Sequence, residues 1–545
     1  MKLFQTNFIF KFLIPVVIIA GIFIFITKSR AETNFDIPST TLSQNGTPWW
    51  NNDYTYRRKI VASDGNDQVI KLNHSQLVID NKSTANGSDL KVVTYDEGNF
   101  DEVPVDITNP DQIETYISFT YKNKRPDLYL YYGDKSDLPE PTKRELKYAN
   151  VNQTASIMDE EVPMLSIVVQ KKWNLKEKDS KLLLQVNDSA IVENSSYYYL
   201  IDDSKTPFNL NIQSNLATID FSEIEDGAHQ LFIIRKNGSE IIRSNSTEFI
   251  ISEPIYVGWT IDWEGVDPGK QNLENVAKIA DEYKIPLTHF FSPRTLSTVK
   301  ISDSRKKEIT NWLKNRINNN GDELDMLLYF QFDMVQEAGV DAKFKEKTWD
   351  NGLSGYDMPG TVYNYDEYSK ILNWGKQKII DAGLPSPQGF RAGGWFVNED
   401  NLKAIKNAGF LYDSSSIKPV ELGENKVMQD WNITSLSQPY NISVTNKNDR
   451  SEDNNSLVEI PINGGDSYIN SKEEIMDNFT SNYSSNSYSN TPKLIVYSSS
   501  PEWIETGKES LENLFATVSN YRYDIDRGPI KFVTLNDWYS NNINR

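Results

Sequence analysis

From residue 255 onward the sequence alternates short apolar segments with longer amphipathic ones, and this pattern constrains the fold more than any other feature. Residues 255–261 and 287–291 are rich in β-branched and aromatic side chains, whereas residues 272–283 repeat apolar side chains at helical spacing. Repeated units of this kind predict a parallel barrel. The later units are helices at 304–318, 366–382 and 399–408, and strands at 325–332, 388–391, 410–413, 457–460, 494–497 and 530–535. In such barrels the carboxyl ends of the strands carry the chemistry.

The sequence between residues 49 and 253 has a different texture, with short β-branched or aromatic segments separated by turn residues. It predicts two all-β sandwich modules, at 49–150 and 160–253. Residues 54–61, 77–79 and 127–133 are among the expected strands of the first. Its opening Trp49-Trp50 and the following Tyr-x-Tyr-Arg-Arg resemble a surface module of unknown function that precedes other extracellular domains. The second module resembles an immunoglobulin-like spacer.

The first 31 residues predict a signal peptide or a membrane anchor. Residues 12–27 are uncharged and mostly apolar, and Lys28 and Arg30 directly after them favour an uncleaved anchor. Residues 32–48 are rich in Thr, Ser, Asn and Pro and predict a linker. We therefore expect a protein of the cell surface or the extracellular space, with the membrane as a partner. Many Asn-x-Ser/Thr sequons fit a glycoprotein, although an Asn- and Ser-rich chain also produces them by chance.

Composition excludes several kinds of site. The 545 residues carry 56 Lys and Arg against 76 Asp and Glu, and this net charge of −20 argues against a nucleic-acid partner. The absence of cysteine excludes disulfides, thiolate metal sites and cysteine nucleophiles. With 3 histidines in the whole chain, any metal must depend largely on oxygen ligands.

Two motifs at predicted strand ends carry the strongest chemical signal. The first is Trp259-Thr-Ile-Asp-Trp-Glu-Gly265, and the second is Phe390-Arg-Ala-Gly-Gly-Trp395. Together with Gly409-Phe-Leu-Tyr-Asp-Ser-Ser415 they resemble the polysaccharide deacetylases, the carbohydrate esterases that share the NodB homology domain. The resemblance covers residues 254–545. It implies a distorted (β/α) barrel of the NodB type, a divalent metal, and a polysaccharide or cell-surface glycan as the partner.

The resemblance also implies roles for individual residues. Asp262 matches the catalytic base, Glu264 matches a metal-binding carboxylate, and Arg391 would orient Asp262 through a charge-assisted bond. The metal-binding histidines of the family are missing, because residues 327–331 read Leu-Leu-Tyr-Phe-Gln. The late histidine is missing too, since the strand at 494–497 runs into serines. A buried ion pair can also be kept for stability alone, so Asp262 and Arg391 do not establish activity.

One histidine could complete a rewired metal site. His289 lies near the end of a predicted strand, and with Asp262 and Glu264 it could bind zinc or a harder cation. The cofactor prediction is thus one divalent metal, zinc before others, or none if the site is dead. The alternative for His289 is a packed or hydrogen-bonded side chain, which is the commoner fate of a lone histidine.

Aromatic residues near these motifs suit a sugar-binding cleft, because aromatic faces stack on pyranose rings. The candidates for substrate contact are Trp263, Trp395 and Tyr329, and the alternative is that they belong to the core.

Three hypotheses for the function follow. The first is a deacetylase-like protein that acts on or binds glycan with weak or absent hydrolysis. The second is an active metal-dependent carbohydrate N-deacetylase with a rewired site. The third is a purely structural envelope glycoprotein.

Overall fold

The computed structural model describes residues 49–543 except 52, 97–98, 123–125, 135–153, 164, 177–180, 189–194, 203, 205, 238–239, 245, 444, 454–455 and 485–486. The predicted signal or anchor at 1–31 and the predicted linker at 32–48 lie outside the described residues. Within the described part of the chain, no helix has both the length and the apolarity needed to cross a bilayer.

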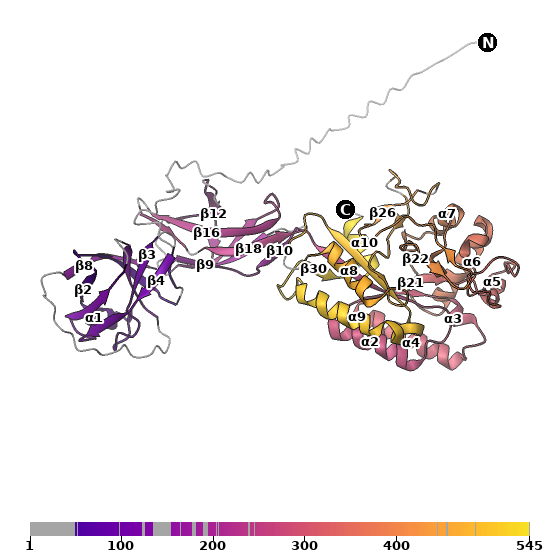
Figure 1. Cartoon of the computed structure of the whole chain (residues 1–545), viewed down its shortest axis with the longest axis horizontal. Coiled ribbons are helices and arrows are strands. Elements are labelled where there is room, and N and C mark those ends of the chain that lie inside the picture. The colour runs from indigo at the N-terminus through magenta and orange to yellow at the C-terminus, as the bar shows by residue number, and fades with distance from the viewer. Residues whose placement is uncertain are drawn as a thin grey trace, which may run out of the picture. The chain divides into compact units, whose positions relative to one another are not determined.

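The first module is a β-sandwich (Figure 1). Its strands are ordered β4-β3-β7-β1-β8-β2-β6-β5, and β8 pairs with β1 in one half and with β2 in the other. Apolar side chains from both halves, such as Leu130 and Ile117, share one buried core. Since β8 runs to Pro163, the sheet extends beyond residue 150, where we expected the module to end. The strands are β1 Tyr56–Val61, β2 Asp67–Leu72, β3 Lys91–Asp96, β4 Asn99–Val103, β5 Val105–Thr108, β6 Thr115–Thr120, β7 Asp127–Tyr132 and β8 Thr154–Pro163.

One strand predicted in this module is wrong. Residues 77–79 belong to helix α1, His74–Ile79, although their side chains favour strands. The side chain of Asn73 accepts a hydrogen bond from the main-chain N–H of Gln76 and so caps the helix. The local capping interaction outweighs the weak β propensity of three residues.

The second β-rich region contains further sheets, as predicted. β12 pairs antiparallel with β13 and β16, β11 pairs antiparallel with β15, and β10 pairs parallel with β18. The strands are β9 Leu165–Val169, β10 Trp173–Leu175, β11 Lys181–Asp188, β12 Ser196–Ile201, β13 Phe208–Leu210, β14 Ile212–Gln213, β15 Leu216–Asp220, β16 Gly227–Asn237, β17 Glu240–Arg243 and β18 Thr247–Ser252. The N-terminal part of the described chain is therefore essentially all β.

The region after Ser252 is an α/β unit built on a ten-stranded curled sheet, which confirms the predicted fold class. Eight of its strands run parallel, in the order β27-β23-β22-β21-β20-β19-β29-β28. Strand β30 also pairs with β19, and β26 pairs antiparallel with β27 at one edge of the sheet. The strands are β19 Ile255–Asp262, β20 Leu287–Phe291, β21 Glu323–Leu328, β22 Gly389–Ala392, β23 Tyr412–Asp413, β26 Tyr440–Asn441, β27 Val458–Glu459, β28 Gly465–Asp466, β29 Lys493–Ser499 and β30 Ile530–Phe532. A separate hairpin joins β24 Glu421–Leu422 to β25 Val427–Met428.

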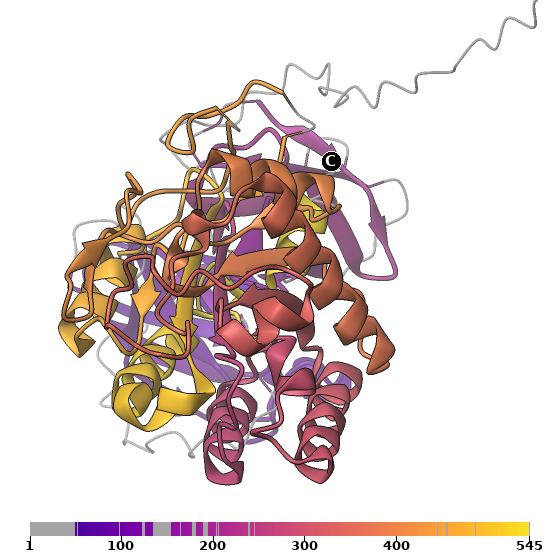
Figure 2. The same ribbon diagram turned by 90° about the vertical axis from the view of Figure 1, so that its right-hand side faces the viewer.

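Helices lie around this sheet (Figure 2). Three of them begin with a capping box, in which Asn364, Asn398 or Ser471 exchanges hydrogen bonds with the residue three positions later. The helices are α2 Lys270–Tyr283, α3 Arg294–Ser297, α4 Asp303–Asn320, α5 Phe332–Glu337, α6 Tyr365–Asp381, α7 Glu399–Asn407, α8 Lys472–Asn482, α9 Ile504–Val518 and α10 Leu535–Asn542.

The two faces of the sheet have separate cores. Ile261, Trp263 and Phe291 belong to the large cluster that includes the helices. Phe290 and Leu327 belong to a second cluster together with residues of β23, β27 and β29. Because neighbouring side chains in a strand point to opposite faces, the second cluster defines the inner face of the curled sheet. The same alternation decides which site residues can meet.

The inner face also buries carboxyl groups at the start of β21. Glu323 is surrounded by Asn536 N–H, the Thr288 hydroxyl and the Tyr412 hydroxyl, and burial raises its pKa to about 8. Asp325 lies two residues along the same strand, and burial raises its pKa as well. Folding therefore shifts both acids toward the protonated form.

We predict that the C-terminal unit is more stable at pH 5 than at pH 8. Above pH 4.5 an unfolded Glu323 is ionised while the folded one stays protonated up to about pH 8, so stability falls as the pH rises through this window. The loss is about 1.4 kcal/mol for each pH unit in which only the folded state holds the proton. Thermal unfolding of wild type and Glu323→Gln at pH 5, 6, 7 and 8 measures it. A Glu323→Gln variant with the same slope as wild type would contradict the assignment.

Candidate functional site

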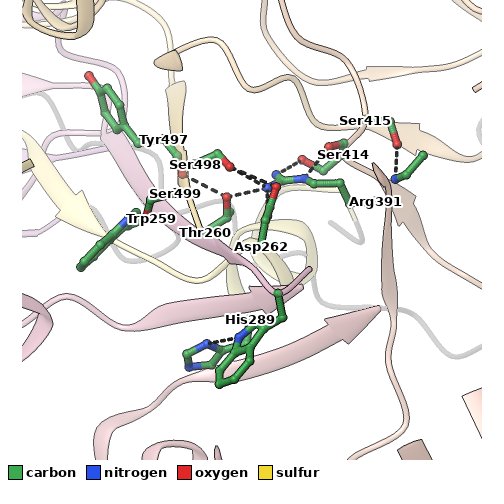
Figure 3. Close-up of polar contacts among 12 residues, drawn as sticks. Trp259, Thr260, Asp262, His289, Arg391, Ser414, Ser415, Tyr497, Ser498 and Ser499 are labelled. Atoms are coloured by element: carbon green, nitrogen blue, oxygen red, sulfur yellow. Dashed lines mark hydrogen bonds and ion pairs between the residues drawn. The ribbon is translucent and has the colours of Figure 1, made fainter. Parts of the chain in front are cut away.

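The centre of the candidate site is an ion pair on the inner face of the sheet (Figure 3). Asp262 is the last residue of β19, and Arg391 lies on β22. The guanidinium Nη1 donates to Asp262 Oδ1 at 2.5 Å, and the Ser498 hydroxyl donates to the other carboxylate oxygen at 3.1 Å. The sequence thus predicted this pair correctly, although its catalytic role stays a prediction.

The remaining contacts of Arg391 tie several strands together. Its Nη1 also donates to the Thr260 hydroxyl, and its Nη2 and Nε donate to the side chain and the main-chain oxygen of Ser414, each at 2.7 Å. The guanidinium carbon lies 4.0 Å from the ring centroid of Phe290. Arg391 is fully buried and held by charged, polar and aromatic neighbours, so it is fixed in position.

Two opposing effects act on Asp262. Burial raises the pKa of this carboxyl, while the charge and hydrogen bond of Arg391 and the Ser498 hydroxyl lower it. Burial is the larger effect. A proton on Asp262 would leave Arg391 buried without an anionic partner, so the two residues are energetically one unit.

Glu264 lies two residues beyond Asp262 and is 5% exposed. The indole N–H of Trp503 lies 3.0 Å from both carboxylate oxygens, and the Tyr356 hydroxyl also hydrogen-bonds to this carboxylate. Burial raises the pKa of Glu264 to about 7 despite these donors. Among the described residues, the side-chain groups that hydrogen-bond to the Glu264 carboxylate are therefore neutral, and none is basic.

Two further carboxyl groups join this site, and the sequence analysis gave neither a role. Asp466 ends β28, where it pairs in register with Ser498, and burial together with repulsion from Asp262 raises its pKa to about 6. Glu502 accepts a hydrogen bond from the main-chain N–H of Glu264 at 3.2 Å, and burial and the Glu264 charge raise its pKa. Glu502 could have been identified from its position shortly after β29, whereas Asp466 ends the two-residue strand β28, which the sequence did not predict.

Aromatic side chains cover the acidic residues. Tyr329 stacks on Tyr356 with 4.6 Å between the ring centroids and an interplanar angle of 9°. Trp503 and Tyr468 form a ring pair at 5.6 Å and are 47% and 55% exposed. Trp395, by contrast, is 8% exposed and packs against Ile417 and Ile462, so its predicted contact with a glycan would need a movement of this cluster.

The structure does not place His289 or Trp263 at this site. Trp263 is fully buried on the helix-facing side of the sheet, so it is not a surface for sugar stacking, and this corrects the prediction. Its indole N–H donates to Nδ1 of His289 at 3.3 Å, and Nε2 of His289 is 2.9 Å from Asp322 Oδ2. Because an indole nitrogen only donates, Nε2 carries the ring proton and donates to Asp322.

His289 is therefore part of a hydrogen-bond network that includes Asp322, which in turn accepts two bonds from Arg316. The pairing of His289 with Ile261 on β19 places it on the helix-facing side, whereas Asp262 faces Arg391 on the inner side. In Figure 3 the His289 ring lies apart from the Asp262–Arg391 pair. The alternation of strand side chains thus separates His289 from the other predicted metal ligands.

The donor set does not fit the divalent metal that the sequence resemblance implies. Among the residues described here, no three His, Cys, Asp or Glu side chains are grouped so that they could hold a metal ion. On β21 and just after it, Leu327 lies in the apolar inner cluster, and Gln331 donates its amide N–H to the main-chain oxygen of Glu264 at 2.8 Å. Leucine cannot bind a metal, and the amide of Gln331 is a weak neutral donor.

Comparisons with known proteins add a likeness in structure. No protein-family model matches the sequence, and no curated protein matches it. Among solved structures, a Mycobacterium smegmatis protein assigned as a polysaccharide deacetylase is 16% identical, with a TM-score of 0.34, and the match covers 53% of this chain and 89% of that one. An acetyl xylan esterase of family 4 from Clostridium thermocellum is 13% identical, with a TM-score of 0.27, and the match covers 52% of this chain and 90% of that one. A peptidoglycan deacetylase from Bacillus subtilis is 12% identical, with a TM-score of 0.25, and the match covers 53% of this chain and 91% of that one. The function therefore has to rest on the residues of the site.

We predict that Arg391→Met destabilises the protein by about 3–5 kcal/mol, because it leaves Asp262 buried without its cation. Asp262→Asn combined with Arg391→Met is expected to cost less than the single Arg391 change, since no charge then remains unpaired. Urea unfolding measures both. As a control, Lys403→Met removes a surface pair with Asp400 and should change stability by less than about 0.5 kcal/mol. Equal losses in the single and double variants would show that the pair is not a unit.

A second prediction concerns His289. Replacing it by Ala should lower the free energy of unfolding by about 2–4 kcal/mol, because Trp263 loses an acceptor and Asp322 a donor. It should leave the amount of zinc or cobalt that copurifies with the protein unchanged, as measured by plasma emission spectrometry. Loss of stoichiometric metal in this variant would instead support the predicted metal-ligand role.

Proposed function

We propose that the C-terminal unit is a glycan-binding, deacetylase-like barrel that hydrolyses acyl groups weakly or not at all. The observation that carries the proposal is the exposed ring pair of Trp503 and Tyr468, which lies beside the carboxylates at the carboxyl ends of β29 and β28. Single exposed aromatic residues are common, but a pair of exposed rings beside polar groups is typical of a binding surface. Together with polar groups they form the usual surface for stacking a sugar ring.

The polar groups needed for orientation are present at the same place. The Trp503 indole N–H is bonded to Glu264, so the aromatic face and a carboxylate form one surface. Tyr468 is also connected to a carboxylate, because its main-chain N–H donates to Asp466 Oδ1 at 2.9 Å. Sugar hydroxyls both donate and accept hydrogen bonds, and carboxylates fix their orientation.

The chemistry of deacetylation is poorly supported by the same residues. Amide hydrolysis needs an electrophile to polarise the carbonyl, a base for water and an acid for the leaving amine. Asp262, oriented by Arg391 and Ser498, could act as the base, but among the described residues no metal site supplies the electrophile. Ser498 lies near the end of β29, where a hydrolase would need an acid for the leaving amine. A serine hydroxyl is a weak acid for this role. Binding is thus better supported than turnover.

The proposed location is the cell surface. The uncharged run at 12–27 would hold the chain at a membrane. A glycan of the cell envelope or its surroundings would then be the ligand.

The test is binding to insoluble polysaccharides of the full chain purified in detergent. Wild type should bind at least one of chitin, acetylated xylan and peptidoglycan, and Trp503→Ala should weaken binding about tenfold or more, because the ring supplies most of the stacking surface. Tyr488→Ala is the control, because Tyr488 is 44% exposed but precedes the first residue of β29, at the opposite end of that strand. Equal loss in both variants would contradict a binding site at Trp503.

The same preparations decide between binding and hydrolysis. We expect no acetate release from acetylated oligosaccharides, with or without added zinc, cobalt or manganese. Metal-dependent release that Asp262→Asn abolishes would show instead that the barrel is an active N-deacetylase with a rewired site. A protein that neither binds nor releases acetate would be a structural component.

A further inference from the structure

We infer that the site favours a glycan with free amino groups, such as a polymer of glucosamine, over the N-acetylated form of the same polymer. The inference rests on the proposed glycan-binding function and goes beyond it, because it specifies the charge of the ligand. Three independent features of the described residues support it.

The first feature is an excess of carboxylates. Glu264, Asp466 and Glu502 form no ion pair with a basic side chain in the part of the chain that the structure describes. Arg391 pairs with Asp262, and its charge also lowers the pKa of Asp466, but less than burial raises it. The carboxyl groups repel one another, Glu264 being close enough to Asp466 and Glu502 to feel both. A cation placed among them would relieve this repulsion and gain charge-assisted hydrogen bonds.

The second feature is an unpaired acceptor in the same place. Gln331 is 2% exposed, and its amide N–H is bonded to the main-chain oxygen of Glu264. Its side-chain oxygen has no hydrogen-bond partner among the described residues. A buried acceptor without a donor is destabilising by about 1–3 kcal/mol, so this group calls for a donor. An ammonium group offers three N–H donors and no acceptor.

The third feature is the exposed aromatic pair beside the carboxylates. Trp503 and Tyr468 present half-exposed rings, and Trp503 and Tyr356 both hydrogen-bond to Glu264. Aromatic faces attract cations as well as stacking on sugar rings. An amino sugar combines both properties, since its pyranose ring can stack while its ammonium group faces the carboxylates.

Acetylation of the amine should weaken binding for a definite reason. It removes the positive charge and adds a carbonyl oxygen, which is an acceptor and would lie against carboxylate acceptors. The site is thus complementary to the amine and not to the amide.

The experiment is isothermal titration calorimetry of the full chain in detergent at pH 7 with hexamers of glucosamine and of N-acetylglucosamine. The glucosamine hexamer should bind at least tenfold more tightly, and its affinity should fall as salt is raised from 50 to 300 mM. Glu502→Gln and Asp466→Asn should each lower affinity for the glucosamine hexamer by about tenfold, the effect of one lost charged hydrogen bond. Glu473→Gln, on the exposed face of α8, removes the same charge elsewhere and should have no effect.

The outcomes separate this inference from the proposed function. Equal or tighter binding of the acetylated hexamer would overturn the preference for amines and leave glycan binding intact. Spermidine that binds as tightly as the glucosamine hexamer, without dependence on Trp503, would overturn the inference because the site would then recognise amines without the sugar. If neither hexamer binds but another polysaccharide does so through Trp503, only the inference fails. If no polysaccharide binds, the proposed function fails first.

Discussion

The buried contact between Arg391 and Asp262 is the interaction on which the inner face of the barrel depends. One guanidinium joins residues of β19 and β22 to Ser414, which directly follows β23, and to Ser498 of β29. Each of these strands is held to its immediate neighbours by main-chain bonds, but Arg391 connects strands that are not adjacent in the sheet. A planar group with five donors suits this task, and a lysine could not replace it.

The alternation of side chains along each strand sorts the candidate residues into two groups. Asp262 points inward, while Ile261 and Trp263 on either side of it point to the helices. His289 on β20 pairs in register with Ile261 on β19, so its side chain lies on the same helix-facing side. A shift of one residue would have exchanged these groups. The site therefore consists of carboxyl, serine and tyrosine groups, and its histidine serves the packing of the outer layer.

The site that results has more negative than positive charge. In a metal enzyme a divalent cation would balance such carboxylates, whereas here burial shifts their protonation toward the neutral acid. The carboxyl pair at Glu323 and Asp325 behaves in the same way at the other end of β21. The inner face of the barrel thus carries acids whose pKa values are raised, and this property links its stability to pH.

The sequence by itself determined the class of fold, most of the alternating strands and helices between residues 255 and 413, and the partnership of Asp262 with Arg391. Those features follow from apolar periodicity and from motifs a few residues long, which are local properties of the chain. It also predicted a strand at 325–332, but β21 ends at Leu328 and α5 begins at Phe332, because an apolar run alone cannot mark where a buried strand gives way to a helix.

Only the tertiary structure decided that Asp466 and Glu502 join the site and that Trp263 and His289 do not. Asp466 and Glu502 lie more than 200 residues from Asp262 in the chain. Their approach depends on the pairing of β28, β29 and β19, and such long-range pairing is set by the packing of the whole sheet.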